Sequence, residues 1–403
     1  MTLDVKKQFP IFEKKIKGKR LTYLDSANSS QKPKVVIDKL NEFYSYEFAN
    51  VGRGIYQLAA NASEKYEDTR SELKKFINCG DDGEIVFTKN STESLNLVAN
   101  CFGENFINEG DEIISTELEH HANYVPWHFI RKKKKAKIKF IPIDDAGNLL
   151  IEKLPELITN KTKIISVTHM SNVTGTIVDI KKIKEIAEEF NIPVCVDGTQ
   201  GAAHLKTDVQ DMGCDFYAFS AHKMYGPTGV GLLYVKYKWL EKFEPFIGGG
   251  GMIDHVSKDD VAYAKGAWKF EAGTMPTAEV VALKESIKFI NQIGKENIAK
   301  HEDGLKDLAI ETLKRNKNVE FVGSPKNQGS VFSLNIKNIH SHDVSTIFDQ
   351  EGVAVRGGHH CCQILHDRLN LNSSIRVSFG VYNEKDDIYA LDEAIKKCEK
   401  IFS

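Results

Sequence analysis

Lys223 lies in a short segment whose residue types could do chemistry. It follows Ser220 and His222 and precedes a glycine-rich turn over 226–231. A hydroxyl and an imidazole beside an amine, next to a tight backbone turn, are typical of a covalent amine at a bound phosphate. Lysines are usually exposed and solvated, so Lys223 alone would indicate little. Its neighbours make it a candidate catalytic residue.

A carboxylate is available to the same site. The apolar run 192–196 predicts a short buried strand that ends in Asp197, with Gln200 shortly after it. Ligands bind at that end of the strands in open α/β sheets. Asp197 could hold a pyridinium nitrogen protonated and Gln200 could reach the phenolic oxygen of the same ring, so pyridoxal phosphate is the predicted cofactor. For Asp197 taken alone, an ordinary helix N-cap is an equally good interpretation.

Strand and helix patterns alternate around these residues. Strand-like runs occur at 84–88, 112–115, 138–143, 163–168 and 231–235, and helical patterns at 95–101 and 180–190 lie between them. This alternation predicts a mostly parallel sheet with helices on both faces. A long helix over 281–293 leads out of this region, and a separate α+β pattern follows from about residue 297.

Two further segments could contact the cofactor. Ser91 and Thr92 stand where a predicted strand turns into a helix, and free amides with hydroxyls bind oxyanions there, although an ordinary Ser/Thr-capped helix fits equally well. His120 and His121 form a pair in which one imidazole could stack on a ring and exchange a proton. A metal site is the less favoured interpretation of the pair, because adjacent side chains rarely converge on one ion.

Motifs from Tyr23-Leu24-Asp25-Ser26-Ala27 to Arg376-Val377-Ser378 resemble those of the class V aminotransferases, and specifically cysteine desulfurases of the SufS group. The resemblance covers nearly the whole chain. It implies the α/β fold of type I pyridoxal-phosphate enzymes, a large domain with a mostly parallel sheet between helices and a smaller C-terminal α+β domain. The expected division is an N-terminal segment over 1–20 packing on the small domain, a cofactor-binding domain over 21–296, and a small domain over 297–403 that carries the catalytic cysteine.

The resemblance also implies roles for single residues. Thr274, in Phe270-Glu271-Ala272-Gly273-Thr274, matches a threonine that reaches the phosphate of the neighbouring subunit, so a homodimer is expected. Arg376 would hold the substrate carboxylate through a two-pronged hydrogen bond, with Asn172 and Arg356 near it. The expected catalytic residues are Lys223, Cys361 and His120, and the expected cofactor contacts are Lys223, Asp197, Gln200, Thr92, Ser220, His222, His120 and Thr274, with no metal.

The segment 353–362 indicates which reaction is catalysed. Arg356 and His360 would favour a thiolate electrostatically, and Cys361 matches the nucleophile of the Arg-X-Gly-His-His-Cys motif in SufS-type enzymes. Cys362 stands where that family commonly has alanine, so which thiol carries the persulfide, or whether the two exchange it, stays open. The alternative is that both cysteines are buried and unreactive, with a structural role alone.

A second departure from the family pattern lies at 51–56. Gly52 and Tyr56 stand where the family often has histidines, whereas Arg53 matches. We therefore expect an altered pocket entrance and unaltered cofactor chemistry.

Composition agrees with an enzyme that acts on a small molecule. The chain has 403 residues, 41% of them hydrophobic, and a formal net charge of −2, which argues against nucleic acid or an anionic membrane as the main partner. The seven cysteines form no disulfide framework and indicate a reducing compartment. With no apolar stretch of membrane length and no signal-peptide pattern, we expect a cytoplasmic location. The basic run 131–135 is expected to be a solvated surface turn.

The resemblance implies conversion of L-cysteine to L-alanine, with a persulfide on Cys361 passed to an acceptor of the SufE or SufU type for iron-sulfur cluster assembly. Selenocysteine lyase and cysteine sulfinate desulfinase are alternatives that would use the same cofactor site. A non-catalytic scaffold binding metal through His359, His360, Cys361 and Cys362 is an alternative from another class, although four consecutive residues suit a tetrahedral ion poorly.

Overall fold

A seven-stranded sheet forms the centre of the computed structural model, which describes residues 3–52 and 54–402. Its strands are parallel except β10, which runs antiparallel to both of its neighbours. The expected mostly parallel α/β sheet is therefore confirmed. The order across the sheet is β4 (Gly83–Thr88), β10 (Gly231–Lys236), β9 (Phe216–Ser220), β8 (Val194–Asp197), β7 (Thr162–Thr168), β5 (Glu112–Thr116) and β6 (Lys137–Ile141).

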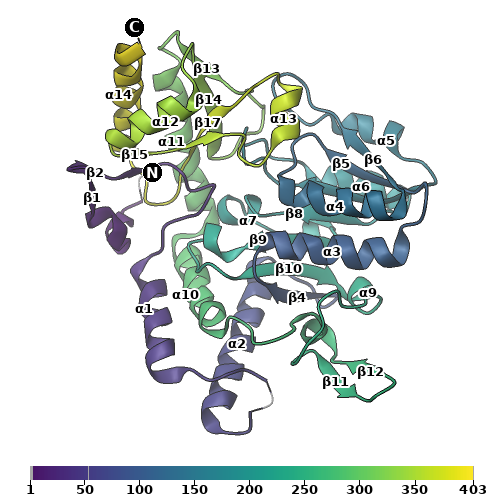
Figure 1. The fold of residues 1–403 in the computed structure, drawn as a ribbon. Helices are drawn as coiled ribbons and strands as arrows, with labels where there is room; N and C mark the ends of the chain where they lie inside the picture. The colour runs from purple at the N-terminus through teal and green to yellow at the C-terminus, as the bar shows by residue number, and fades with distance from the viewer. Residues whose placement is uncertain (1–2, 53, 403) are drawn as a thin grey trace.

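Both faces of this sheet are buried, and alternate residues of each strand enter different cores. In β8, Val194 and Val196 join the core shared with α2 (Gln57–Phe76), α6 (Ile180–Glu189) and α10 (Thr277–Ile293), whereas Cys195 joins the core beneath α3 (Ser91–Phe106) and α4 (His121–Lys134). Strand side chains point alternately to opposite faces, so a strand covered on both sides needs apolar residues at every position. Figure 1 shows α3 and α4 together on one face of the sheet.

A second, antiparallel sheet lies in the C-terminal part of the chain. Its order is β13 (Val319–Phe321), β14 (Val331–Ile336), β17 (Ser374–Ser378) and β16 (Arg356–Gly358). Its apolar face packs with α11 (Lys295–Leu313), α12 (Ser341–Gln350) and α14 (Lys385–Phe402) in a separate core. Near the start of the chain, β3 (Thr22–Tyr23) pairs in parallel with β15 (Val353–Ala354), and Arg20 forms an ion pair of 2.7 Å with Asp387 of α14. The first residues thus lie against the C-terminal elements.

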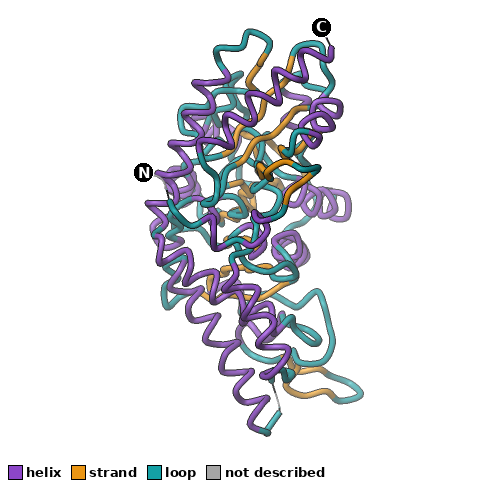
Figure 2. The backbone as a smooth tube through the Cα atoms, turned by 90° about the vertical axis from the view of Figure 1, so that its left-hand side faces the viewer, coloured by secondary structure: helices purple, strands orange, loops and turns teal. Residues whose placement is uncertain are grey.

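The side view in Figure 2 shows an elongated molecule, with the C-terminus at one end and a short exposed hairpin, β11 (Ile253–Val256) and β12 (Val261–Tyr263), toward the other. Among the described residues no helix is long and apolar enough to cross a membrane. The remaining α-helices and strands are α1 (Lys34–Glu42), α5 (Leu154–Leu157), α7 (Gly201–His204), α8 (Val209–Met212), α9 (Tyr237–Leu240), α13 (Gln363–Arg368), β1 (Lys15–Ile16) and β2 (Lys19–Arg20).

One local expectation is wrong. The basic run 131–135 is not a turn, because 131–134 form the last turn of α4 and Lys135 ends it with a left-handed φ of 53°. Positive side chains are favoured at that end of a helix, where the backbone carbonyls carry partial negative charge. The run is mostly exposed, as expected, but its charge serves to end a helix.

Candidate active site

A cavity of about 240 Å³ opens at the carboxyl edge of the large sheet. Asp197 is the last residue of β8 and Ser220 the last of β9, so two adjacent parallel strands deliver polar groups to the same place. Most of the predicted site residues line this cavity, namely Thr92, His120, Asn172, Asp197, Gln200, Ser220, His222 and Lys223.

Lys223 ends a short 3-10 turn, η5 (Ala221–Lys223), that directly follows β9. Burial lowers the pKa of its amine from 10.5 to about 8, and the nearby positive charge of Arg376 adds to the effect. A neutral amine is the nucleophilic and basic form of lysine. The fold therefore makes Lys223 more reactive near neutral pH than a solvated lysine.

Asp197 is held ready to face a cation. Its Oδ1 accepts hydrogen bonds from the backbone N–H of Thr199 at 3.0 Å and from the Thr199 hydroxyl. Burial raises its pKa, whereas these bonds and the charge of Lys223 oppose that rise. The helix-cap interpretation of Asp197 is wrong, because Gln200 occupies the N-cap position of the next helix, α7.

Gln200 has one amide atom in use and one free. Its Nε2 donates to the carbonyl of Ala27 at 2.7 Å, while its Oε1 is buried without a hydrogen-bond partner among the described residues. A buried polar atom without a partner is costly and points to a missing ligand or water. Gln200 lines the cavity, so a polar ligand bound there could supply that partner.

The N-terminus of α3 lies at the cavity beside β9. Asn90 caps this helix by accepting from the N–H of Glu93, and the N–H of Ser91 donates to Ser220 Oγ at 2.8 Å. Gly231 of β10 allows the approach, since a Cβ there would lie 2.2 Å from the Asn90 carbonyl carbon. The Ser220 hydroxyl, the imidazole of His222 and the first turn of α3 with Thr92 thus form one polar wall of the cavity.

His120 caps the start of α4, where its Nδ1 accepts from the N–H of Ala122 at 3.0 Å. Burial lowers the pKa of this imidazole to about 3, and the charge of Lys223 contributes. His120 is therefore neutral at physiological pH, with its proton on Nε2. His121 has a different place, because its backbone N–H donates to the carbonyl of Cys361 at 2.7 Å.

The side chains of the two adjacent cysteines lie in different surroundings. Cys361 is partly exposed and lines a mainly apolar groove of about 250 Å³ on α4, together with Thr92 and His120. Cys362 is fully buried, and its thiol donates to the carbonyl of Glu119 at 3.1 Å. Burial also raises the pKa of Cys362, so this thiol stays protonated. Of the two, only Cys361 has the access that a reactive thiol needs.

Two arginines lie side by side on the small sheet, where Arg356 of β16 pairs in register with Arg376 of β17. Arg376 is buried, donates to Asp25 at 2.9 Å and to the carbonyl of Asn172 at 3.3 Å, and keeps its Nε without a partner among the described residues. Arg356 donates to Asn28 at 2.6 Å. Asn172 links this group to the cysteine loop, because its amide donates to the carbonyl of His360 at 2.7 Å.

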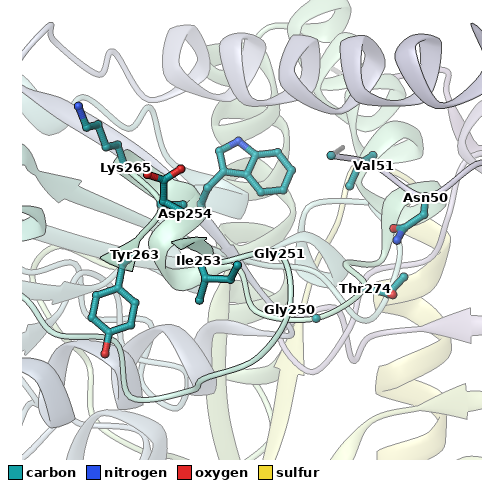
Figure 3. Close-up of a pocket in the computed structure, with 13 residues that line it drawn as sticks. Asn50, Val51, Gly250, Gly251, Ile253, Asp254, Tyr263, Lys265 and Thr274 are labelled. Carbon is teal, nitrogen blue, oxygen red and sulfur yellow. The ribbon is translucent and has the colours of Figure 1, made fainter. Parts of the chain in front are cut away.

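Thr274 lies outside the Lys223 cavity. It lines a separate cavity of about 900 Å³, where Figure 3 places it near Asn50 and Val51, on the other side from Asp254 and Tyr263. Gly52 lines this second cavity, and Arg53 falls outside the described residues. One chain alone therefore does not bring Thr274 to Lys223. Tyr56 is exposed.

Several residues at the site carried no expected role. Asp25 and Asn28 hold the two arginines, Thr199 holds Asp197, and the buried carboxyl of Glu119 accepts from the N–H of Thr168 at 2.8 Å. Burial raises the pKa of Glu119 to about 8. The motifs 23–27 and 119–127 contain Asp25 and Glu119, but residue types alone do not reveal these long-range contacts. In the described part of the chain no group of three or more His, Cys, Asp and Glu side chains is placed to hold a metal ion.

Comparison with known proteins agrees with this geometry. The family described as aminotransferase class V matches residues 22–391. A probable cysteine desulfurase of Staphylococcus aureus (strain Mu50 / ATCC 700699) is 46% identical over 401 residues, which cover 99% of this chain and 97% of that protein. The structure of a cysteine desulfurase from Thermococcus onnurineus NA1 superposes with a TM-score of 0.93 at 35% identity and covers 99% of this chain and all of the other.

A more distant structure supports the fold alone. A C-DES mutant with glycine covalently linked to its pyridoxal-phosphate cofactor has a TM-score of 0.84 at 21% identity, over 98% of this chain and 99% of the other. Since the match to the family spans most of the chain and the identity to named relatives is high, this chain belongs to the class V aminotransferase family and, within it, to the cysteine desulfurases.

Proposed function

We propose that this chain is a pyridoxal-phosphate-dependent cysteine desulfurase that converts L-cysteine to L-alanine and leaves a persulfide on Cys361. One observation carries the proposal. Thr92 and His120 line both the cavity that holds Lys223 and the groove that holds Cys361, so the two spaces adjoin. A substrate bound between them would have a base at one end and a thiol at the other.

The residues of the cavity fit the cofactor. The unpartnered Oε1 of Gln200 and the buried carboxylate of Asp197 suit the polar edge of a pyridinium ring, and Ser220, His222 and Thr92 suit a phosphate. His120 is neutral and can stack on the ring, and Lys223 is the amine available for a covalent link. When bound, the cofactor supplies an electron sink that stabilises negative charge on the substrate Cα. The cofactor reported for the C-DES structure supports this choice.

Lys223 and Arg376 act on the amino-acid end of the substrate. Arg376 has a buried Nε that finds no partner in the described part of the chain and can grip the α-carboxylate, with Asn172 and Arg356 beside it. Once its amine is free, Lys223 takes the α-proton, and its lowered pKa keeps part of it in the basic form near neutral pH. Asp197 maintains the proton on the ring nitrogen throughout.

Cys361 acts on the sulfur end. Its thiolate attacks the substrate Sγ, an S–S bond forms, and the Cβ–Sγ bond breaks with its electron pair left on the alanine skeleton. Protonation of that skeleton gives L-alanine, and the sulfane sulfur stays on Cys361 as a persulfide. The positive charge of Arg376 interacts with Cys361, whereas burial lowers the pKa of His360 and leaves that imidazole uncharged. The partial exposure of Cys361 leaves the persulfide open to a second protein.

Three further features belong to the same proposal. A homodimer completes the site, since Thr274 is remote from Lys223 within one chain and would serve the phosphate of its partner. A dedicated acceptor of the SufE or SufU type takes the sulfur toward iron-sulfur cluster assembly. The reaction takes place in the cytoplasm, which suits seven cysteines that are all free thiols.

The decisive experiment is to incubate the purified yellow protein with L-cysteine and measure alanine, with mass spectrometry of the undigested and digested protein under non-reducing conditions. We expect one alanine per added sulfur and a mass increase on the peptide that contains Cys361. Relative kcat/KM for cysteine, selenocysteine and cysteine sulfinate separates this activity from selenocysteine lyase and sulfinate desulfinase. A clear preference for either of the other substrates would overturn the assignment.

A further inference from the structure

The segment from Asp25 to Lys32, between β3 and α1, contacts several separate parts of the site. We call it the N-terminal strap. Asp25 pairs with Arg376 at 2.9 Å and Asn28 accepts from Arg356 at 2.6 Å. The carbonyl of Ala27 accepts from Gln200 at 2.7 Å. The strap therefore joins residues on the two sheets that must act on one substrate.

The last part of the strap converges on a single backbone atom, the carbonyl oxygen of His222. This oxygen accepts from the N–H of Ser30, from the hydroxyls of Ser29 and Ser30, all at 3.1 Å, and from Lys32 Nζ at 2.8 Å. All four donors belong to the strap, so this one oxygen is the point at which the strap meets the turn that carries Lys223. The peptide that carries this oxygen also carries the backbone nitrogen of Lys223, so its orientation directs the Lys223 side chain.

Lys32 is the donor that bridges the two chain segments. Its Nζ donates to the carbonyl of Ser30 at 2.6 Å as well as to that of His222, so one atom joins the strap backbone to the Lys223 turn. Ser30 extends the contact, because its Oγ accepts from the N–H of Tyr225 at 2.7 Å. The strap is thus fixed on both sides of Lys223.

The surroundings of Lys32 do not suit an ordinary surface lysine. Among the described residues no carboxylate pairs with it, and its charge acts on the imidazole of His222. Burial lowers its pKa to about 7. The neutral amine still has two N–H groups for the two carbonyls, so the contact does not depend on the charge.

We propose that Lys32 is a positioning residue for the reaction, which clamps the N-terminal strap to the carbonyl of His222 and so fixes the Lys223 amine relative to Arg376. The catalytic role of the Lys223 amine rests on the proposed function. The contact of Lys32 with the carbonyl of His222 is present in the protein without its cofactor. Catalysis depends steeply on such placement, because a misplacement of about 1 Å can cost on the order of 100-fold in rate.

The test compares Lys32→Met, which keeps the side-chain length and removes the donors, with Lys34→Met as the matched control. Lys34 is exposed, and within the described residues its ion-pair partner is Asp38 alone. Hydrogen exchange on the cofactor-free proteins reads the clamp directly. We expect peptides covering 25–33 and 222–226 to exchange at least tenfold faster in Lys32→Met than in the control, with the rest of the protein unchanged.

In the loaded enzyme we expect Lys32→Met to lower kcat for alanine formation roughly 10- to 100-fold with a smaller change in KM. Lys32→Arg, which keeps donors, should recover part of that loss. Exchange and kcat within twofold of the Lys34→Met control would overturn the proposal. So would equal losses in Lys32→Met and Lys32→Arg with faster exchange over the whole protein, since Lys32 would then serve packing alone. If wild-type enzyme makes no alanine, the proposed function fails while the exchange result still decides the clamp.

Discussion

The surroundings of Lys223 and those of Cys361 differ in how they hold a reactive group. Lys223 is enclosed at the edge of the large sheet, where burial lowers the pKa of its amine to about 8. Cys361 lies partly exposed on a loop after β16 of the small sheet. In the proposed reaction the base must be kept from water, whereas a thiol that passes on sulfur must be reachable. The fold assigns these opposite demands to different sheets.

The cysteine loop is held in a costly conformation. His360 and Cys361 both have left-handed backbones, with φ of 53° and 55°, at a cost of roughly 1–2 kcal/mol for each residue. Two hydrogen bonds offset this cost, from Asn172 to the carbonyl of His360 and from the N–H of His121 to the carbonyl of Cys361. The resulting turn directs Cys361 to the groove and Cys362 into the core.

Lys223→Ala should have the largest effect. In the proposed mechanism this change removes both the amine that links the cofactor and the base for the α-proton, so we expect alanine formation to fall by more than about 1,000-fold. The protein should lose the absorbance that borohydride abolishes in the wild type. Sulfide release at the wild-type rate by this variant would contradict the assignment of Lys223 as the catalytic lysine.

Cys361→Ala distinguishes the step at Cys361 from the steps at Lys223. We expect cysteine desulfuration to fall by roughly 100-fold or more, while the yellow colour and the spectral change on adding cysteine persist, because binding and proton removal use Lys223 and Arg376. Activity on selenocysteine should survive in large part, since selenium leaves more readily. Stopped-flow absorbance and alanine assays check both halves, and an active variant with its persulfide on Cys362 would reverse the choice of nucleophile.

Asp197→Asn tests the cofactor side alone. The amide can still accept the Thr199 hydrogen bonds, but it carries no negative charge to hold a ring proton. We expect the cofactor to bind and kcat to fall by roughly 100-fold. An unchanged kcat would mean that Asp197 only fixes the turn after β8.

The pKa of Lys223 predicts a pH dependence in the cofactor-free protein. Because burial favours the neutral amine, the fraction able to react with an aldehyde should be half-maximal near pH 8 and fall about tenfold for each pH unit below that. Pulse labelling with formaldehyde and borohydride, read by mass spectrometry, gives this midpoint, and Lys34 in the same digest corrects for the reagent. A Lys223 labelling curve that keeps rising toward pH 10.5 would show that burial does not lower this pKa.

The two regions also differ in what their sequence reveals. The apolar run before Asp197 predicts β8, and the residue types around Lys223 indicate the cofactor, because strand periodicity and a local turn need no distant information. The predicted run 163–168 differs by one residue from β7 (Thr162–Thr168). By contrast, the contact of Lys32 with His222 spans 190 residues of sequence, and a local sequence pattern cannot predict it.

Other parts of the site show why residue types are insufficient. Cys361 and Cys362 are the same residue type, so the sequence does not distinguish them. The left-handed turn at 360–361 places them in different environments. The basic run 131–135 has the composition of a loop, yet 131–134 continue α4, whose apolar residues Ala122, Trp127 and Ile130 pack in the core. The proposed role of Thr274 requires a second copy of the chain, and only the resemblance to the family indicates that copy.

Cys362→Ala should have the smallest effect on catalysis. It tests whether the buried thiol takes any part in sulfur transfer. Its thiol is fully buried and donates to a backbone carbonyl, so it cannot reach substrate sulfur without unfolding the loop. We expect kcat within about threefold of wild type and a loss of roughly 1–2 kcal/mol in the free energy of unfolding, from a small cavity and an unpaired carbonyl of Glu119. Urea denaturation and the alanine assay measure the two quantities. If activity were lost while stability stayed unchanged, Cys362 would take part in sulfur transfer, and the division between an enclosed base and a single accessible thiol would no longer hold.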